Sequence, residues 1–287
     1  LTLNPAAVEA AITSKTKAVM PVHMCGSMAD LASLKHICDK HQLLLLEDAC
    51  QAIGGSYAGK PLGSYGDLGC FSFDFVKTIT CGEGGAVITN NDTYADHAHK
   101  YHDHGHDHIG NDRGAESHPF LGYNYRISEL NAAVGIAQLR KLDHTISLQQ
   151  KNYSILRSAL ATIPEVSFRS VPDTGVESYA FLSFFLPDEN IARKAHKTLG
   201  EHGVDACFYW YDNNWHYYKK WEHLLTPSSL IKYADDIVSG LQKNNKAFPA
   251  SDAWIGRTIS CLIKVGWSEN DVKERASKMV EALASIL

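Results

Sequence analysis

One lysine stands where an amine could attack an aldehyde. Lys77 follows the strand-like stretch Phe71-Ser72-Phe73 and lies among apolar residues, with Val76 and Ile79 close by. Removing an amine from water lowers its pKa and makes it a more competent nucleophile. A lone lysine after a strand is otherwise an ordinary surface residue, so this interpretation depends on the residues that accompany it.

Two polar residues accompany this lysine at the ends of apolar runs. Asp48 follows the apolar stretch 43–47, where its carboxylate can hold a heteroaromatic nitrogen protonated or simply form a turn. Ser72 points to the opposite face of its strand from its two phenylalanine neighbours, and its hydroxyl can donate to a phosphate or to the backbone. Residues 82–85, Gly-Glu-Gly-Gly, permit a close turn beside a ligand, although a bare turn explains them equally well.

The elements that must position these residues alternate between strand and helix. Residues 17–22 predict a short strand, and Asp30 is a predicted N-cap for a helix whose apolar residues recur at helical spacing up to Cys38. Residues 43–47 predict the next strand, so the order indicates a βαβ unit and a mostly parallel sheet. Asp48 then lies at the carboxyl edge, where open α/β sheets bind ligands.

Further elements complete an α/β fold with two domains. Strands are predicted at 70–73 and 86–89, and Ser128 caps a helix expected to run on towards Ile146. Beyond it, strands are predicted at 181–186 and 204–210, and helices at 191–202 and 270–287. The change in character near Thr145 predicts a large domain over residues 1–145 and a smaller α+β domain over residues 146–287.

Composition excludes several classes of protein. The chain has 287 residues, 45% of them hydrophobic, which is enough to bury a substantial core. A net charge of −5 does not build the basic field of a nucleic-acid-binding protein. No apolar run is long enough to span a membrane, and residues 1–10 do not resemble a signal peptide. Seven scattered cysteines without a CxxC pair favour reduced thiols in a cytoplasm.

The spacing of these motifs resembles a known family, the DegT/DnrJ/EryC/StrS sugar aminotransferases. The resemblance extends from Leu1 to about Arg140, whereas the C-terminal half agrees only in its general layout. The matching segments, in chain order, are Pro21-Val22-His23, Asp48 with Gln51, Phe71-Ser72-Phe73 with Lys77, Gly82-Glu83-Gly84-Gly85, Gly122-Tyr123-Asn124-Tyr125-Arg126 and Glu129-Leu130-Asn131-Ala132-Ala133.

The resemblance implies a fold-type I enzyme that depends on pyridoxal 5'-phosphate. Lys77 would be the Schiff-base lysine and would then move a proton between the two carbons of the amine–imine pair. Asp48 would keep the pyridine nitrogen protonated, which makes the ring an electron sink. Gln51 would lie near the phenolic oxygen, Ser72 would bind the phosphate, and Asn124 would reach the phosphate of the neighbouring subunit in a homodimer.

The resemblance also implies the reaction. Glutamate would donate the amino group in a ping-pong cycle, and a keto-sugar or keto-sugar acid would accept it. A dehydratase branch of the family carries histidine in place of the lysine, so Lys77 favours transamination. The family pattern further includes a phosphate-binding segment at a helix N-terminus, with an aromatic residue that stacks on the ring; we expect this part of the large domain to be absent from the sequence as given.

A histidine-rich stretch departs from the family pattern. Six histidines fall between His97 and His108, which suggests a metal site, but alternating His and Asp in a loop does not fix a tetrahedral geometry. We therefore predict no metal and a substrate-facing loop, in which His104, Arg113 and Arg126 contact the substrate.

This loop, with Arg113-Gly114-Ala115-Glu116, resembles the branch of the family that makes 8-amino-3,8-dideoxy-manno-octulosonate for lipopolysaccharide. Three alternatives stay open at this point. The first is a nucleotide-sugar aminotransferase of the perosamine type, and the second is an inactive homologue that acts by binding. The third is a metal-dependent enzyme that uses the histidines.

Overall fold

The computed structural model describes residues 1–225, 235–244 and 248–287. Backbone contacts divide the chain into two compact units. The first unit comprises Thr2–Leu148 and Val171–Ala180, and the second comprises Gln149–Ser170, Phe181–Leu287 and Leu1. Helix α5 (Leu142–Leu160) continues from the first unit into the second. The domain border near Thr145 therefore stays a prediction.

The first unit is built on a four-stranded sheet in the order β1-β2-β5-β6. The pairs β1–β2 and β2–β5 are parallel, and β5–β6 is antiparallel, so the predicted mostly parallel α/β sheet is confirmed. The strands are β1 (Ala18–Val19), β2 (Leu44–Asp48), β5 (Leu68–Ser72) and β6 (Gly85–Ile88). A small antiparallel sheet adds β3 (Ser56–Tyr57), β4 (Lys60–Pro61) and β8 (Gly175–Val176).

The βαβ unit forms where the sequence predicts it. Helix α2 (Leu31–His41) starts at Asp30, whose side chain accepts a hydrogen bond from the Ser33 amide at 3.1 Å. Its apolar face, with Leu31 and Leu34, packs into one buried cluster with Leu45 of β2. The remaining helices of this unit are α1 (Pro5–Ala11), η1 (Met24–Gly26), α3 (Asp92–His102), η2 (Arg113–Ala115) and α4 (Glu129–Leu139).

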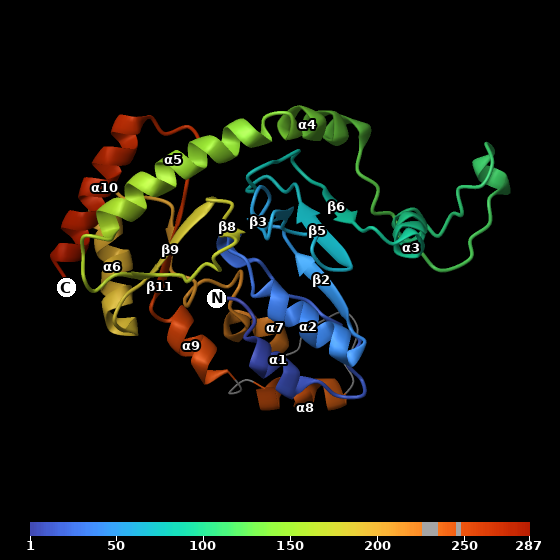
Figure 1. Cartoon of the computed structure of the whole chain (residues 1–287), viewed down its shortest axis with the longest axis horizontal. Coiled ribbons are helices and arrows are strands. Elements are labelled where there is room, and N and C mark those ends of the chain that lie inside the picture. The colour runs from blue at the N-terminus through green and yellow to red at the C-terminus, as the bar shows by residue number, and fades with distance from the viewer. Residues whose placement is uncertain (226–234, 245–247) are drawn as a thin grey trace. The chain divides into compact units, whose positions relative to one another are not determined.

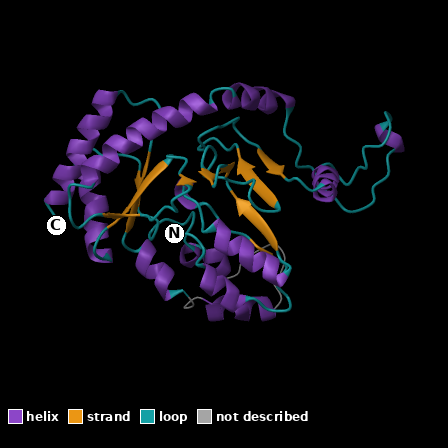
Figure 2. Cartoon of the chain, viewed as in Figure 1, coloured by secondary structure: helices purple, strands orange, loops and turns teal. Residues whose placement is uncertain are grey.

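The second unit is α+β, with an antiparallel sheet in the order β10-β11-β9-β7. Helices α6 and α10 lie side by side next to this sheet (Figure 2). The strands are β7 (Ser167–Phe168), β9 (Phe181–Phe185), β10 (Cys207–Phe208) and β11 (Thr258–Leu262). The helices are α6 (Glu189–Glu201), η3 (Tyr218–Lys220), α7 (Glu222–Leu225), α8 (Asp235–Asn244), α9 (Pro249–Ile255) and α10 (Glu269–Ala284).

Two predicted elements differ from the structure. The helix that Ser128 caps was expected to run on to Ile146, but α4 ends at Leu139 and α5 begins at Leu142. The strand expected over 204–210 is only the two-residue β10, because the aromatic residues after Phe208 turn away into a loop. Within the part of the chain that the structure describes, no helix is both long and apolar enough to cross a membrane.

Candidate cofactor and substrate site

Lys77 lies in the loop that joins β5 to β6. The backbone of Phe73 closes this loop: its N–H donates to the Gly84 carbonyl at 2.9 Å, and its carbonyl accepts from the Cys81 N–H at 3.0 Å. Lys77 is half-buried, and its Nζ makes no hydrogen bond or ion pair with any described residue. The loop therefore presents an amine that is available to a ligand.

Asp48 and Ser72 lie at the carboxyl ends of the neighbouring parallel strands β2 and β5. The Asp48 Oδ1 accepts a hydrogen bond from the Cys50 N–H at 3.1 Å, and no described residue donates to Oδ2. The Ser72 hydroxyl accepts from the Asp74 N–H at 3.3 Å, and no described residue accepts its proton. Adjacent strands lie about 4.8 Å apart, so these two unfilled polar groups share one edge of the sheet.

The electrostatics of Cys50 connect Asp48 with Lys77. Burial is the main cause that raises the pKa of Cys50 to about 12, and the adjacent Asp48 carboxylate adds to it. The positive charge of Lys77 acts on the same thiol in the opposite sense. The amine and the carboxylate therefore both lie within electrostatic reach of Cys50.

Glu47 holds the carboxyl edge of the sheet in place through hydrogen bonds, a role that the sequence motifs do not predict. It is fully buried and accepts four hydrogen bonds: from His23 Nε2 and the Gly63 amide, both at 2.9 Å, and from the amides of Tyr65 and Gly66 at 2.6 and 2.7 Å. Its position inside an apolar strand was the available signal, because a buried carboxylate requires partners.

His23 is fully bonded within this core. Its Nε2 donates to Glu47, and its Nδ1 accepts from the Ala29 amide at 3.2 Å. Both ring nitrogens are therefore occupied, and His23 is a positioning residue beside the site.

Gln51 also has a positioning contact. Its side-chain oxygen accepts a hydrogen bond from the Cys25 N–H at 2.8 Å. Cys25 has a positive φ of 56°, a conformation that costs energy for a residue other than glycine and therefore needs support. Gln51 thus holds the turn of η1 against the start of the loop after β2. Its predicted place near the phenolic oxygen of the cofactor stays a prediction.

The glycine turn after the lysine loop is held by helix α4. Asn131 Nδ2 donates to the carbonyls of Cys81 at 2.8 Å and Glu83 at 3.0 Å. Gly84 has a φ of 155°, and a Cβ on it would lie 2.8 Å from the Ile127 side chain. The turn therefore requires glycine because of close packing around its backbone.

The apolar residues that directly precede Lys77 are exposed, not packed around its side chain. Phe75 is 73% exposed and Val76 is also exposed. The sequence correctly predicts apolar neighbours, but apolar residues of such a loop are buried only if another surface covers them.

The second group of predicted residues gathers around Asp103, at the end of α3. Its carboxylate is buried, and Oδ1 accepts from Arg113 Nη2 at 2.6 Å and from Arg126 Nη1. His104 Nδ1 lies 3.3 Å from the same oxygen. The hydrogen bond from Arg113 is the main cause that holds the pKa of Asp103 far below its usual range, with Arg126 and His104 acting in the same direction.

The carboxylate and histidines of this cluster approach a metal-binding arrangement. Asp103, His104 and His106 each offer a ligand atom, and these atoms lie within 4.8 Å of one another. The two guanidinium groups already occupy Oδ1 of Asp103, and Arg126 Nη1 lies 3.3 Å from His104 Nδ1. A cation placed there would meet two fixed positive charges, so the cluster suits an anionic ligand better.

The structure brings the predicted residues together in two groups. Lys77, Asp48, Gln51 and Ser72 belong to the sheet edge, whereas the others belong to the Asp103 cluster. Asn124 joins the second group through an antiparallel bridge to Asp103, and its side chain is exposed. We call residues 103–127 the arm, because Figure 1 shows this segment leaving the sheet beyond α3.

Comparison with known proteins decides the family. Residues 1–279 match the DegT/DnrJ/EryC1/StrS aminotransferase family. The chain belongs to this family. Its members are pyridoxal-phosphate-dependent aminotransferases, so the fold and the family expected from the sequence motifs are confirmed.

Several relatives are named for their activities. The chain is 34% identical over 269 residues to a GDP-perosamine synthase of Vibrio cholerae, covering 93% of this chain and 66% of that protein. It is 38% identical over 195 residues to an L-glutamine:2-deoxy-scyllo-inosose aminotransferase of Streptoalloteichus tenebrarius, covering 66% of this chain and 46% of that protein. The chain thus spans less than two thirds of the length of these relatives.

A solved aminotransferase from Psychrobacter cryohalolentis has the same fold. The two superpose with a TM-score of 0.85 at 23% identity, covering 99% of this chain and 73% of that one.

The residues at the sheet edge fit the cofactor of this family. Pyridoxal phosphate carries an aldehyde, a basic ring nitrogen and a phosphate, and the edge offers an unpaired amine, an open carboxylate oxygen and a hydroxyl donor in Lys77, Asp48 and Ser72.

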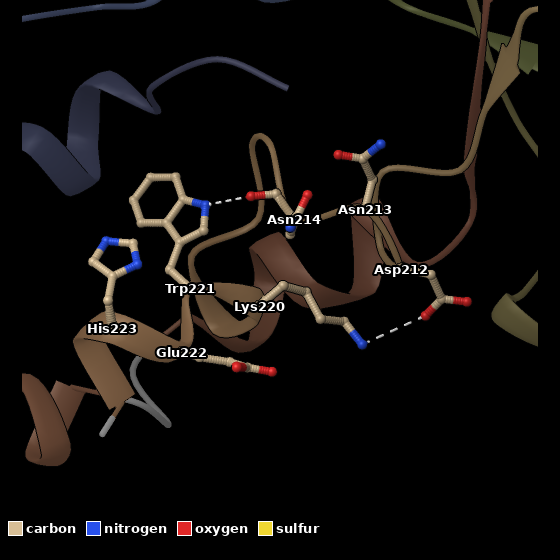
Figure 3. A pocket seen from close by; sticks show the side chains of 7 residues that line it. All are labelled: Asp212, Asn213, Asn214, Lys220, Trp221, Glu222 and His223. Atoms are coloured by element: carbon tan, nitrogen blue, oxygen red, sulfur yellow. Dashed lines mark hydrogen bonds and ion pairs between the residues drawn. The ribbon is translucent and has the colours of Figure 1, made fainter. Parts of the chain in front are cut away.

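An open pocket of about 720 Å³ lies within the second unit. Figure 3 shows the Trp221 indole N–H donating to the Asn214 carbonyl at 2.7 Å, and Lys220 paired with Asp212 at 3.6 Å. Its lining residues are Asp212, Asn213, Asn214, Lys220, Trp221, Glu222 and His223. A flat indole among amides and charged groups suits a hydroxyl-rich ligand.

Proposed function

We propose that this chain carries out pyridoxal-phosphate-dependent transfer of an amino group from glutamate to a keto-sugar or keto-sugar acid. The observation that carries the proposal is the set of three unfilled polar groups at the sheet edge, in a chain of this family. Lys77 stands at the position where the dehydratase branch has histidine, and this supports transamination.

Each of these residues has a defined task. When bound, the cofactor supplies a protonated ring that withdraws electrons from the reacting carbon. Lys77 holds the cofactor through its Nζ and afterwards carries the proton between the two reacting carbons. Asp48 keeps the ring nitrogen protonated through its open Oδ2, and Ser72 donates its hydroxyl proton to the phosphate. Glu47 and His23 keep this edge rigid.

We further propose that two subunits share each site. The arm, to which Asn124 and the Asp103 cluster belong, extends away from the sheet beyond α3 (Figure 1). Helix α4, which follows the arm, has no buried residue among the described positions and exposes Leu130 at 82%, together with Val134. Such an apolar face is typical of a homodimer interface, and a homodimer would let Asn124 reach a partner's cofactor phosphate.

The acceptor is proposed from the charge of the arm. Arg113 and Arg126 concentrate positive charge beside the Asp103 carboxylate, and Glu116 also acts on Arg113. That charge favours an anionic acceptor, and a sugar acid carries a carboxylate. We therefore propose the keto-sugar acid that yields 8-amino-3,8-dideoxy-manno-octulosonate for lipopolysaccharide, in the cytoplasm. The likeness to a GDP-perosamine synthase favours a second candidate, a 4-keto nucleotide sugar, whose diphosphate is also anionic.

Absorption spectroscopy tests the amino-transfer proposal. With pyridoxal phosphate, the chain should show a visible band that bleaches on adding glutamate. Borohydride should trap the cofactor on the peptide that contains Lys77. Lys77→Ala should lack the band, whereas Lys60→Ala, a change at an exposed lysine, should keep it. A band that glutamate does not bleach would support the inactive homologue instead. Trapping at another lysine would overturn the proposal.

The two acceptors can be separated in the reverse half-reaction. After glutamate has bleached the band, the keto-sugar acid should restore it and the GDP-linked 4-keto sugar should not. Arg113→Gln should raise the KM for the sugar acid roughly 10- to 100-fold, the effect of losing one charge-assisted hydrogen bond. Restoration by the GDP-sugar alone would favour the perosamine-type reaction.

A further inference from the structure

Two cysteines of the second unit face each other across neighbouring strands. Cys207 of β10 and Cys261 of β11 are direct partners in the antiparallel register. The Leu262 N–H donates to the Ala206 carbonyl at 2.9 Å, so the adjacent pair 206/262 is hydrogen-bonded and the pair 207/261 is not. Residues at a non-hydrogen-bonded position have Cα atoms about 4.5 Å apart, within the range that a disulfide spans.

A buried arginine lies against both sulfur atoms. Nη2 of Arg275, on α10, is 3.6 Å from Cys261 Sγ and 4.0 Å from Cys207 Sγ, and its Nη1 donates to Asp205 Oδ1 at 2.6 Å. The hydrogen bond from Cys207 is the main cause that lowers the pKa of Cys261, and the charge of Arg275 acts in the same sense. The Cys261 thiolate is therefore stabilised by the Cys207 thiol and by the fixed positive charge of Arg275.

We propose that Cys207 and Cys261 form a reversible disulfide in exchange with a small-molecule disulfide such as oxidised glutathione. Cys207 is partly exposed and Cys261 is fully buried, so Cys207 reacts first. Cys207 passes its proton to the Cys261 thiolate along the hydrogen bond between them, then attacks one sulfur of the small disulfide and releases one thiolate from it. Cys261 then loses its proton, attacks the Cys207 sulfur and releases the second thiol. Two electrons pass from the cysteine pair to the small disulfide.

The bond would brace an edge strand. β10 is only two residues long and, among the described strands, lies at the edge of its sheet beside β11. The disulfide would close a covalent loop that includes the pocket residues Asp212, Asn213 and Asn214, which begin four residues after β10. Oxidation would therefore restrict both the strand and the segment that lines the pocket.

Peptide mapping of the intact chain tests the proposal. The protein is equilibrated in glutathione buffers of increasing oxidised fraction, alkylated and digested with trypsin. Each cysteine then lies in a tryptic peptide of its own, residues 198–219 and 258–264. These peptides should become linked, with the loss of two hydrogens, and dithiothreitol should reverse the link. Two peptides that each carry glutathione, or that stay reduced in the most oxidising buffer, would overturn the proposal.

Substitutions sharpen the test. Cys207→Ala and Cys261→Ala should each abolish the link, whereas Cys38→Ala, at a buried cysteine of the first unit, should leave it unchanged. Arg275→Gln should slow disulfide formation roughly tenfold because less thiolate is present, and Arg275→Lys should restore most of the rate. Equal rates of disulfide formation in wild type and Arg275→Gln would contradict the role of the guanidinium. The peptide mapping of the wild-type protein does not depend on whether any variant folds.

Discussion

Glu47 shows how one buried carboxylate can organise a site that it does not enter. Burial alone would raise its pKa, but the hydrogen bonds from His23 and from the amides of Gly66 and Gly63 outweigh burial and hold the pKa below its usual value. The same bonds tie β2 to the loop that precedes β5. Asp48, the next residue along β2, therefore has a fixed backbone.

Replacing Glu47 with Gln should destabilise the protein strongly. The change leaves His23 without its anionic partner and one backbone amide without an acceptor, which costs about 3 kcal/mol at a buried pair. Urea unfolding followed by circular dichroism measures the loss. Glu9→Gln, at a carboxylate paired with Lys40 on the surface, is the matched control and should leave the midpoint unchanged. Similar midpoints for both variants would contradict the role of Glu47.

The lowered pKa of Glu47 also predicts how stability depends on pH. A carboxylate whose pKa is lower in the folded state stabilises the fold above its unfolded pKa of about 4.3, and that contribution is lost as the pH falls through the folded value. The unfolding midpoint of wild type should therefore fall between about pH 5 and about pH 3, and Glu47→Gln should fall less over the same interval. Parallel curves for the two proteins would argue against this linkage.

At the residue scale, the motifs predicted which side chains meet at the sheet edge but not what supports them. Asp48 and Ser72 end neighbouring parallel strands, so strand order alone places them at one edge, and Lys77 lies in the loop after the second strand. The four partners of Glu47 come from two separate segments: His23 precedes η1, and the other three, all backbone amides, belong to the loop before β5. No periodicity in the sequence encodes such a convergence.

At the scale of elements, helix α4 has an apolar face that is exposed. Leu130 and Val134 are four residues apart and so lie on one side of the helix, and both are exposed. The sequence predicts this helix from the same spacing. Spacing, however, shows only that a face is apolar. It does not show whether the chain itself or a second copy buries that face.

Charged residues on this face should prevent dimerisation. Leu130→Glu combined with Val134→Glu would bury two carboxylates at the proposed interface, and each costs several kcal/mol when unpaired. Light scattering after size-exclusion chromatography should show a dimer for wild type and a monomer for the variant. Lys197→Glu, a charge change on the exposed side of α6, should leave the dimer intact. A dimeric double variant would place the interface elsewhere.

The break between α4 and α5 is a second feature of this scale. The apolar pattern continues through residues 139–142, so the sequence predicts one long helix. In the structure, Arg140 and Lys141 separate the two helices. An interruption of two residues with helical propensity leaves no local signal, because only the packing on either side determines it.

At the scale of the whole molecule, the proposed site draws on residues of two chains. Lys77 and Asn124 would act in the same site only if they come from different subunits. Mixing Lys77→Ala with Asn124→Ala should therefore restore cofactor binding, because a mixed dimer has one site with both residues intact. Random re-pairing gives about one quarter of the wild-type sites. The amplitude of the visible absorption band measures this recovery.

Neither variant alone should recover the absorption band. The matched control takes each variant alone through the same dissociation and reassociation. A full band in Asn124→Ala alone would remove Asn124 from the site. No recovery in the mixture, with mixed dimers demonstrated by mass spectrometry, would show that the two residues do not meet across the interface.

The path of the chain has a consequence for dissecting the protein. Strand β8 lies beyond α5 in the sequence, yet it pairs with β3 and belongs to the first unit. Cutting the gene near Thr145 would therefore separate β3 from a neighbour and leave its unpaired amides and carbonyls open to other chains. The fragment that comprises residues 1–145 should aggregate rather than fold by itself. An autonomous version of the first unit would need residues 171–180 supplied through a designed linker, since no single cut recovers it.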